Sequence, residues 1–294
     1  MSREIELLKS RVNPLVFGIF GHTYDLNGEH IARVGGSGIF VAPFQTLAAT
    51  HVSRDLFRTD PTREDDLRRK SSGYFELPYS SVLFQATQPL GGQPRVLLWH
   101  VCRTWDPVVT DICLMEVYAE KDEAAGMEHQ MTGFFQWALV PPPVGSHVVM
   151  LGYPQTDIKT SNNLMNISLN YVLQEGEIAD VFEDRRDRGM FNFPGFRINK
   201  VVDHGFSGGP VFWENRLCGV VSGGTIDDGT YAASLWPLCL LEYEYPDLGA
   251  LGGKRVFGDL FEFGVLKSQD WRHIKDRITK VDGADGRPYP HMNP

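Results

Sequence analysis

Residues 205–210, with the sequence GFSGGP, contain the residue types that nucleophilic catalysis requires. A serine hydroxyl is a weak nucleophile, so it needs a neighbouring base and backbone N–H groups that stabilise a developing oxyanion. The glycines beside Ser207 allow a tight turn, and they let a carbonyl group approach without meeting a Cβ atom. A glycine-rich turn with an incidental serine would have the same sequence. Ser207 is therefore a candidate nucleophile whose base must lie elsewhere in the chain.

The pattern Gly-x-Ser-x-Gly also occurs in the nucleophile elbow of α/β-hydrolases, where the serine lies between a strand and a helix. Here Pro210 and the β-like run VFWE follow the serine, and a second β-like run, CGVVSGG, comes after a turn at Asn215. In the elbow the acid and the histidine lie downstream of the serine. Only His273 and His291 lie downstream of Ser207, on a predicted surface helix and in the tail. This context excludes the elbow.

Two residues of the first half could complete a catalytic site with Ser207. His51 ends the small apolar run LAAT and precedes a charged segment, so its backbone is anchored while its ring can face a cleft. Asp111 begins the apolar run DICLMEV, and a buried carboxylate costs several kcal/mol unless it has a hydrogen-bonding partner. Taken singly, each also fits a structural histidine or a turn residue at a strand entry.

Four segments together resemble the trypsin/chymotrypsin superfamily of serine peptidases, particularly its HtrA-like members. They are GSGIFVAPFQTLAATHV (36–52), DICLMEV (111–117), PPVGSHVVMLGYP (142–154) and GFSGGPVFWENRLCGVVSGG (205–224). The order His, Asp, Ser is that of this fold and differs from the order in subtilisin and in α/β-hydrolases. The resemblance covers most of residues 15–280 and implies an all-β, chymotrypsin-like double β-barrel.

The resemblance implies a role for each of these residues. Ser207 would attack the scissile carbonyl, His51 would transfer its proton to the leaving amine, and Asp111 would hold the imidazole. The N–H groups of Gly205 and Ser207 would form the oxyanion hole. Ser222 matches the serine that supports the aspartate, and it begins the segment that pairs with a substrate bound as an added β-strand.

Other positions depart from the digestive members of the superfamily. Phe206 replaces the acidic residue that pairs with a new N-terminus after zymogen cleavage, so we do not expect such processing to be the switch. Val201, six residues before the nucleophile, cannot pair with Arg or Lys, and Gly223 and Gly224 leave one wall of the pocket open. We therefore expect cleavage after small-to-medium apolar residues.

Short β-branched and aromatic runs separated by turns predict an all-β barrel architecture. Together with the resemblance, this implies a single trypsin-like peptidase domain over residues 1–280. Its expected parts are an N-terminal barrel (about 14–122), a C-terminal barrel (about 131–265), a C-terminal helix (268–280) and, beyond the domain, a mobile tail (281–294). The helix is predicted from the apolar stripe of Trp271, Ile274 and Ile278, with Ser268 or Asp270 as its cap. A short amphipathic helix is predicted over 3–11, and the charged segment 53–72 predicts a solvated loop or an exposed helix.

Composition limits the partners and the location of the protein. The 294 residues carry a net charge of −9, which leaves no basic surplus for nucleic acid. The N-terminus lacks the apolar core of a signal peptide, and no run approaches 18 apolar residues, so we expect a cytoplasmic protein without a membrane partner. No zinc-binding spacing is present, and no metal or other cofactor is expected. All four cysteines are expected to be reduced: Cys102, Cys113, Cys218 and Cys239.

Three functions agree with this sequence. The leading hypothesis is an intracellular serine endopeptidase that acts on protein or peptide substrates. The second is a catalytically silent, protease-like binding module that keeps the barrels for recognition. The third is an enzyme that stays inactive until an activating protein partner orders its loops.

Overall fold

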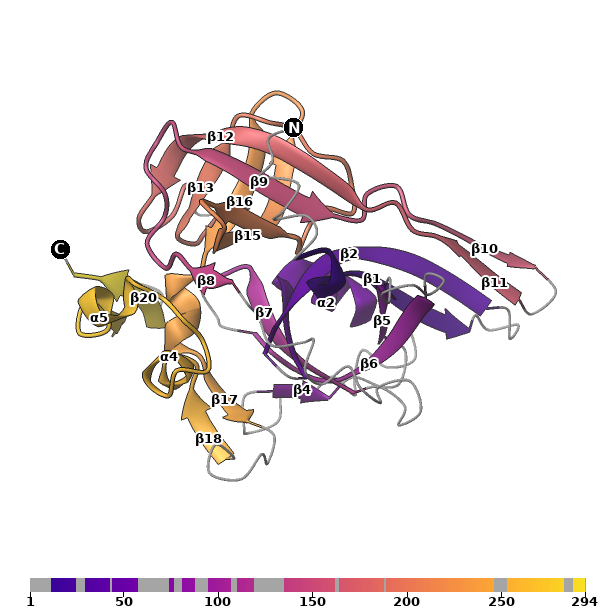
Figure 1. The fold of residues 1–294 in the computed structure, drawn as a ribbon, viewed down its shortest axis with the longest axis horizontal. Coiled ribbons are helices and arrows are strands. Elements are labelled where there is room, and N and C mark those ends of the chain that lie inside the picture. Colours follow the sequence, from indigo (N-terminus) through magenta and orange to yellow (C-terminus); the bar gives the residue numbers. More distant parts are fainter. Residues whose placement is uncertain are drawn as a thin grey trace.

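The protein is built mainly from β-strands that form two barrels (Figure 1). The computed structural model describes residues 12–24, 30–42, 44–57, 74–76, 81–87, 95–106, 110–118, 135–161, 164–187, 189–245, 253–282 and 288–293. The helix predicted over 3–11 lies outside these residues, as does most of the charged segment 53–72. The first residues of that segment belong to a helix, α2 (Thr50–Phe57).

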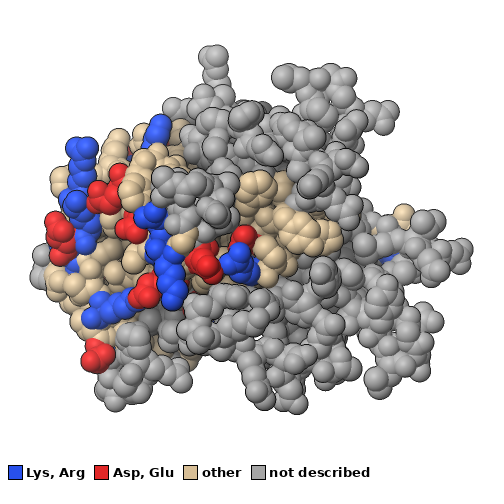
Figure 2. All heavy atoms as spheres, turned by 90° about the horizontal axis from the view of Figure 1, so that it is seen from below, with Lys and Arg blue, Asp and Glu red and all other residues tan. Residues whose placement is uncertain are grey.

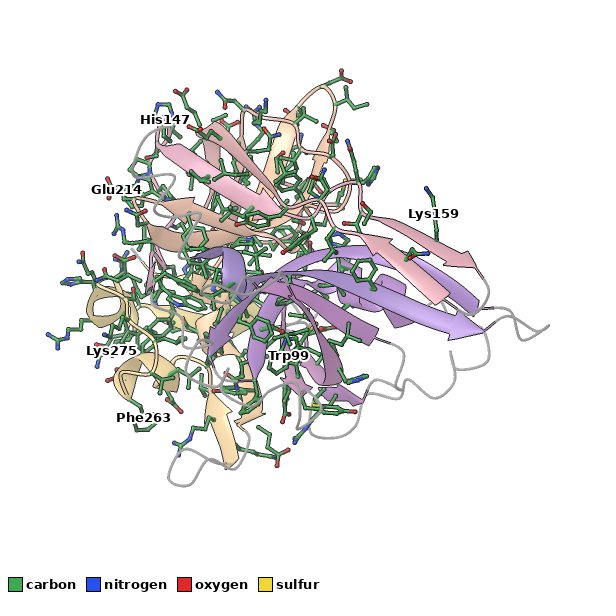
Figure 3. All side chains as sticks on the ribbon, turned by 45° about the vertical axis from the view of Figure 1, so that its right-hand side comes forward. Trp99, His147, Lys159, Glu214, Phe263 and Lys275 are labelled. Atoms are coloured by element: carbon green, nitrogen blue, oxygen red, sulfur yellow. The ribbon has the colours of Figure 1, made fainter. Side chains whose placement is uncertain are left out.

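Six strands of the first half close a barrel through antiparallel pairs. They are β1 (Val16–Tyr24), β2 (His30–Ala42), β3 (Gln45–Ala49), β5 (Ser81–Thr87), β6 (Arg95–Trp105) and β7 (Ile112–Tyr118). The ring runs β1-β2-β3-β7-β6-β5 and returns to β1, while β4 (Tyr74–Glu76) pairs with β6. Inside it, the ring of Phe40 packs edge-to-face on Phe17 and on Trp99, with centroids 5.1 and 5.2 Å apart. Trp99 is labelled in the interior of this barrel in Figure 3.

Six strands of the second half repeat this topology. They are β9 (His147–Gly152), β12 (Val172–Phe182), β13 (Gly195–Ile198), β14 (Pro210–Trp213), β15 (Arg216–Thr225) and β16 (Gly229–Ser234). Their ring runs β9-β12-β13-β16-β15-β14 and returns to β9, so both barrels connect their first to sixth strands in the same order. A further strand, β8 (Gln136–Trp137), pairs in parallel with β15. The predicted all-β, chymotrypsin-like double barrel is confirmed.

Local sequence explains the turn that follows the nucleophile segment. Glu214 and Asn215 join β14 to β15 as a two-residue loop, and both have positive φ angles of 47° and 60°. Two left-handed residues match the right-handed twist of the flanking strands, and asparagine tolerates that conformation well. The predicted turn at Asn215 is confirmed.

The prediction for the C-terminus is wrong in two respects. The helix expected over 268–280 is reduced to the single turn α5 (Trp271–Ile274), and β19 (Ile278–Asp282) pairs with β20 (Pro288–Met292) in what was expected to be a mobile tail. The Asp270 carboxylate does not cap the helix. It accepts hydrogen bonds from the N–H groups of Leu139 and Val140 at 2.8 and 3.3 Å, which ties this segment to the second barrel. The β-branched residues that follow favour a strand.

Several smaller elements surround the barrels. They are η1 (Asn13–Leu15), the hairpin β10 (Asp157–Ser161) and β11 (Leu164–Ser168), η2 (Trp236–Leu240), the hairpin β17 (Glu242–Tyr245) and β18 (Gly253–Val256), and α4 (Asp259–Glu262).

The β10–β11 hairpin projects beside the first barrel, with Lys159 pointing away from the molecule (Figures 1 and 3). On the described part of the face seen in Figure 2, basic and acidic side chains are interspersed.

No helix in the described part of the chain has the length and the apolar character needed to cross a membrane.

Candidate active site

His51 and Asp111 meet because β3 pairs with β7. The last pair of that register, Ala49 with Ile112, places the start of α2 beside the residue before β7. The backbone N–H of His51 donates to Asp111 Oδ1 at 3.0 Å, and its ring Nδ1 lies 2.8 Å from Asp111 Oδ2. A carboxylate beside Nδ1 holds the proton on that nitrogen, so Nε2 of the neutral ring is the acceptor. The imidazole is thereby prepared to take a proton at Nε2.

A serine of the second barrel completes the environment of Asp111. Ser222, on β15, donates its hydroxyl to Asp111 Oδ2. The carboxylate therefore accepts from two groups of His51 and from Ser222, and only 12% of its side chain is exposed. Each added donor to a carboxylate restricts its rotation. This contact also joins the two barrels directly at the site.

Two glycines shape the loop that carries Ser207. Gly205 and Gly208 have φ angles of +99° and +87°, a region that other residues rarely adopt. A Cβ atom on Gly205 would lie 2.6 Å from Tyr153 O, and one on Gly208 would lie 2.0 Å from Ser37 O. The hydroxyl of Ser207 donates to Ser222 O at 3.2 Å. Because a hydroxyl has one proton, attack on a substrate requires that this proton turn toward His51 Nε2.

The carbonyl groups of residues 204–207 all accept hydrogen bonds from the protein. The donors are Gln155 N to His204 O (3.4 Å), Ser37 Oγ to Gly205 O (2.6 Å), Gly209 N to Phe206 O (2.8 Å) and Ser37 N to Ser207 O (2.8 Å). In a trans peptide the N–H points opposite to the carbonyl of the same unit. Within the described residues, the N–H groups of Gly205 and Ser207 donate to no acceptor. These two N–H groups can therefore receive a substrate oxygen.

Sequence reasoning missed Ser37, which lies on β2 and is fully buried. Its hydroxyl donates to Gly205 O and accepts from Tyr153 N at 2.8 Å, so both of its hydrogen-bonding roles are used. Its neighbour Gly36 packs directly on the nucleophile loop, because a Cβ atom there would lie 2.4 Å from Ser207 O. The signal was the Gly-Ser-Gly sequence at the start of segment 36–52, in which only a small residue fits on either side of the serine.

A cleft of about 930 Å³ contains every residue that the sequence predicted for the site: the triad, Gly205, Val201, Ser222, Gly223 and Gly224. Val201 is 44% exposed there. The two glycines of β15 differ in what they allow. A Cβ atom on Gly224 would lie 2.7 Å from Gly229 O, whereas one on Gly223 would meet no atom within 4 Å. Packing therefore requires a glycine at position 224, whereas Gly223 leaves open space in the cleft.

The structure also places the cysteines. All four thiols are free, as predicted. Cys113 lies on β7 behind Asp111, fully buried, and burial raises its pKa well above the ordinary value. A buried, neutral thiol is a poor nucleophile, so Cys113 is not a candidate nucleophile. No group of His, Cys, Asp or Glu in the described part of the chain could hold a metal ion.

Comparison with known proteins gives only distant similarities. No protein-family model matches this chain, and no curated protein matches it. A crystal structure of the Rv3671c protease in an inactive form aligns with a TM-score of 0.44 and 18% identity, covering 77% of this chain and 86% of that chain. A serine-to-alanine mutant of Rv3671c from M. tuberculosis H37Rv, also an inactive form, aligns with a TM-score of 0.42 and 18% identity, covering 77% and 84%. The function of this chain must therefore be inferred from the residues of its own cleft.

Proposed function

We propose that this chain is a serine endopeptidase in which Ser207 is the nucleophile, His51 the general base and Asp111 the residue that orients the base. The observation that carries the proposal is the contact between His51 Nδ1 and Asp111 Oδ2 beside a serine whose loop has two unused N–H groups. A base, its orienting carboxylate and oxyanion donors together are what acyl transfer requires. A turn with an incidental serine needs none of them.

The chemistry follows from these positions. Ser207 Oγ turns from Ser222 O to His51 Nε2, gives up its proton there and attacks the scissile carbonyl carbon. The carbonyl oxygen then becomes an oxyanion, which accepts hydrogen bonds from the N–H groups of Gly205 and Ser207. The imidazolium donates its proton to the leaving amine, which leaves an acyl-enzyme. Water, deprotonated by His51, attacks the acyl carbon. The bond from this carbon to Ser207 Oγ then breaks, and the His51 imidazolium returns its proton to Oγ as the acid product leaves.

The free edge of β15 supports a peptide as the substrate. From Gly223 to Thr225 this strand pairs with β16 on one side, and no described strand pairs with its other edge. An extended peptide can add there as an antiparallel strand. Val201 borders the cleft beside Ser207, so the residue before the scissile bond is proposed to be small or medium-sized and apolar.

Phe206 supports control by something other than zymogen cleavage. Its ring is 1% exposed and belongs to the apolar core of the second barrel. A newly formed N-terminal ammonium group would find no carboxylate at this position. We therefore propose regulation by a protein partner or another signal. The free thiols agree with a reducing compartment, and we propose the cytoplasm as the location.

A fluorophosphonate probe tests the proposal, because it labels only an activated serine. The wild type and Ser207→Ala are treated as purified proteins and in cell lysate, with Ser234→Ala as the control for loss of a buried hydroxyl away from the cleft. Labelling that Ser207→Ala abolishes and Ser234→Ala retains supports the enzyme. Labelling only in lysate supports activation by a partner. An unlabelled wild type under both conditions overturns the proposal in favour of a catalytically silent binding module.

A further inference from the structure

Two exposed apolar side chains border the cleft on opposite loops. Ile226, 88% exposed, lies in the turn between β15 and β16, and Met190, 74% exposed, lies in the loop between β12 and β13. Both belong to the cleft that contains Ser207. Large apolar side chains on a free surface lose the stabilisation of burial, which a bound apolar group would restore.

The direction of β15 shows which part of a peptide would meet them. Ser222 O lies 3.2 Å from Ser207 Oγ, so the residue whose carbonyl is attacked lies opposite Ser222. In an antiparallel pair, each further residue on β15 faces one residue nearer the N-terminus of the peptide. Thr225, the last residue of β15, therefore faces the fourth residue before the scissile bond, and Ile226 follows it at the start of the turn. Between Ser222 and Thr225, Gly223 contributes no side chain that would block the path.

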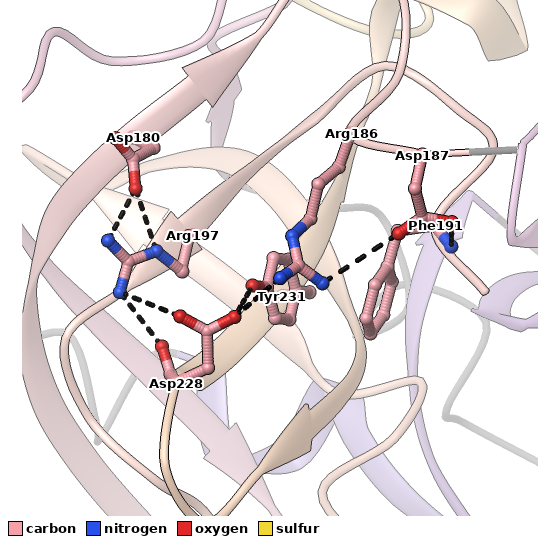
Figure 4. Close-up of polar contacts among 7 residues, drawn as sticks. All are labelled: Asp180, Arg186, Asp187, Phe191, Arg197, Asp228 and Tyr231. Carbon is pink, nitrogen blue, oxygen red and sulfur yellow. Dashed lines mark hydrogen bonds and ion pairs between the residues drawn. The ribbon is translucent and has the colours of Figure 1, made fainter. Parts of the chain in front are cut away.

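A cluster of charged and aromatic residues joins the two loops that carry Met190 and Ile226 (Figure 4). Arg186 Nη2, from the β12–β13 loop, lies 2.7 Å from Oδ2 of Asp228, in the β15–β16 turn. Tyr231 donates its hydroxyl to the same oxygen, and its ring stacks on Phe191 with centroids 4.0 Å apart. Arg197 binds the other oxygen of Asp228 at 3.3 Å. The two loops are thereby held at a fixed separation.

The turn that presents Met190 is itself fixed from the same cluster. Asp187 Oδ1 accepts hydrogen bonds from the N–H groups of Gly189 and Phe191 at 2.7 and 3.3 Å, so Met190 lies between two anchored residues. Hydrogen bonds from these backbone groups lower the pKa of Asp187, which keeps the carboxylate charged. Because Arg186 and Asp228 are both about one-third exposed, their pair adds little to stability, and its effect is on geometry.

We propose that Met190 and Ile226 form an apolar subsite for the fourth or fifth residue before the scissile bond, and that the Arg186–Asp228 pair sets the width of this subsite. The proposal rests on the endopeptidase function and names its substrates: extended peptides with a second apolar side chain well upstream of the cut. A subsite held open in advance loses less conformational entropy when the peptide binds.

The test compares two acylated pentapeptide esters, which carry either Leu or Ser at the fourth and fifth positions before the cleaved bond, with an acetylated single-residue ester. For the wild type, kcat/KM for the Leu peptide should be at least about 10-fold higher than for the Ser peptide, because burial of one Leu side chain stabilises the bound state by enough to give this ratio of kcat/KM values. The double variant Met190→Ser/Ile226→Ser should bring this Leu-to-Ser ratio near one, and it should leave kcat/KM for the short ester unchanged. Asp228→Asn and Arg186→Met should each lower the ratio. Glu214→Gln, which removes an exposed ion pair with Arg216 on another hairpin, should not.

The same peptides, titrated into Ser207→Ala by fluorescence anisotropy, give the ratio of Kd values without catalysis. A ratio that the double variant leaves unchanged overturns the subsite. A ratio that falls in the double variant but not in Asp228→Asn or Arg186→Met overturns the role of the ion pair. If no ester is cleaved in a Ser207-dependent way but the Kd ratio behaves as expected, the endopeptidase function fails and the subsite stands as a peptide-binding site. Unfolding midpoints of all variants identify any that fail to fold.

Discussion

Replacement of Ser37 by alanine tests how the first barrel supports the nucleophile loop of the second. The substitution removes the donor to Gly205 O and the acceptor for Tyr153 N, and it keeps the backbone contact of residue 37 with Ser207 O. Ser37 has no exposed surface and Tyr153 is 1% exposed, so water does not readily replace the lost hydroxyl. Gly205 O then loses its buried donor, and its peptide unit is held only through the N–H of Phe206, which donates to Asp203 O at 3.3 Å. This unit lies between the two peptide units that carry the N–H groups of Gly205 and Ser207, so its rotation would displace these oxyanion donors.

The expected effects on stability and on catalysis are separate. Buried polar groups left without partners cost about 1–3 kcal/mol of unfolding free energy. Direct removal of one oxyanion donor lowers kcat by about 10²–10³-fold. Ser37 holds neither donor directly, so we expect kcat to fall by about 10–100-fold, which corresponds to about 1.4–2.7 kcal/mol of transition-state stabilisation. KM should change little, because the oxyanion exists only after attack.

The assay is active-site titration with a fluorophosphonate, followed by kcat and KM per titrated site and by urea unfolding. Ser234→Ala is the matched control, because Ser234 is also fully buried and its hydroxyl has no hydrogen-bonding partner among the residues that the structure describes. It should leave kcat unchanged. If Ser37→Ala lowers the unfolding free energy as expected but keeps the wild-type kcat per titrated site, Ser37 is a structural residue only, and the link between its hydroxyl and the oxyanion hole is refuted.

Three further predictions concern the rest of the site. Asp111→Asn should lower kcat by about 10³–10⁴-fold, because an amide can hold the wrong imidazole tautomer; an effect below 10-fold in stopped-flow or steady-state assays would contradict the role of Asp111. Activity should rise with pH around pH 6.5, where imidazoles ordinarily lose their proton, and a flat profile from pH 5 to 8 would count against His51 as the base. Burial raises the pKa of Cys102 to about 11 and those of the other three thiols above their ordinary value. Ellman's reagent at pH 8 should therefore react slowly with the native protein, and it should react rapidly with all four thiols after unfolding. Iodoacetamide should leave the peptidase activity intact, and a rapid loss of activity with this reagent would disprove the prediction.

The architecture was predictable because strand signals are local. Alternating or β-branched runs and turn residues such as Asn215 mark each strand within a few positions, and the glycines around Ser207 mark a turn that few other residues could make. The order of His51, Asp111 and Ser207 then selects one fold among those that use such residues. This order does not predict the register of β3 against β7. The 2.8 Å contact between His51 Nδ1 and Asp111 Oδ2 depends on that register.

Features that depend on distant partners were missed. In the sequence, Ser37 is only a small residue between two glycines. Its role depends on Gly205, which lies 168 residues later in the chain and accepts a hydrogen bond from its hydroxyl. Arg186 and Asp228 lie in two irregular loops, and neither carries a sequence signal for the other. The C-terminal helix was wrong for the same reason, because Asp270 bonds to N–H groups near residue 139 instead of its own helix. Propensity describes a segment alone, and tertiary contacts decided these cases.

The hydrogen bonds of Ser37 also constrain when the site can form during synthesis. Chains leave the ribosome from the N-terminus, and domains fold as their residues emerge. His51 and Asp111 can meet as soon as the first barrel is complete, but Ser207 and its loop emerge about a hundred residues later and need the buried hydroxyl of that barrel to fix them. A nascent chain, or a fragment released early, would hold a base without its nucleophile. Under the proposed function, proteolytic competence would therefore appear only after both halves have been synthesised and docked, so a half-synthesised chain would not cleave its neighbours.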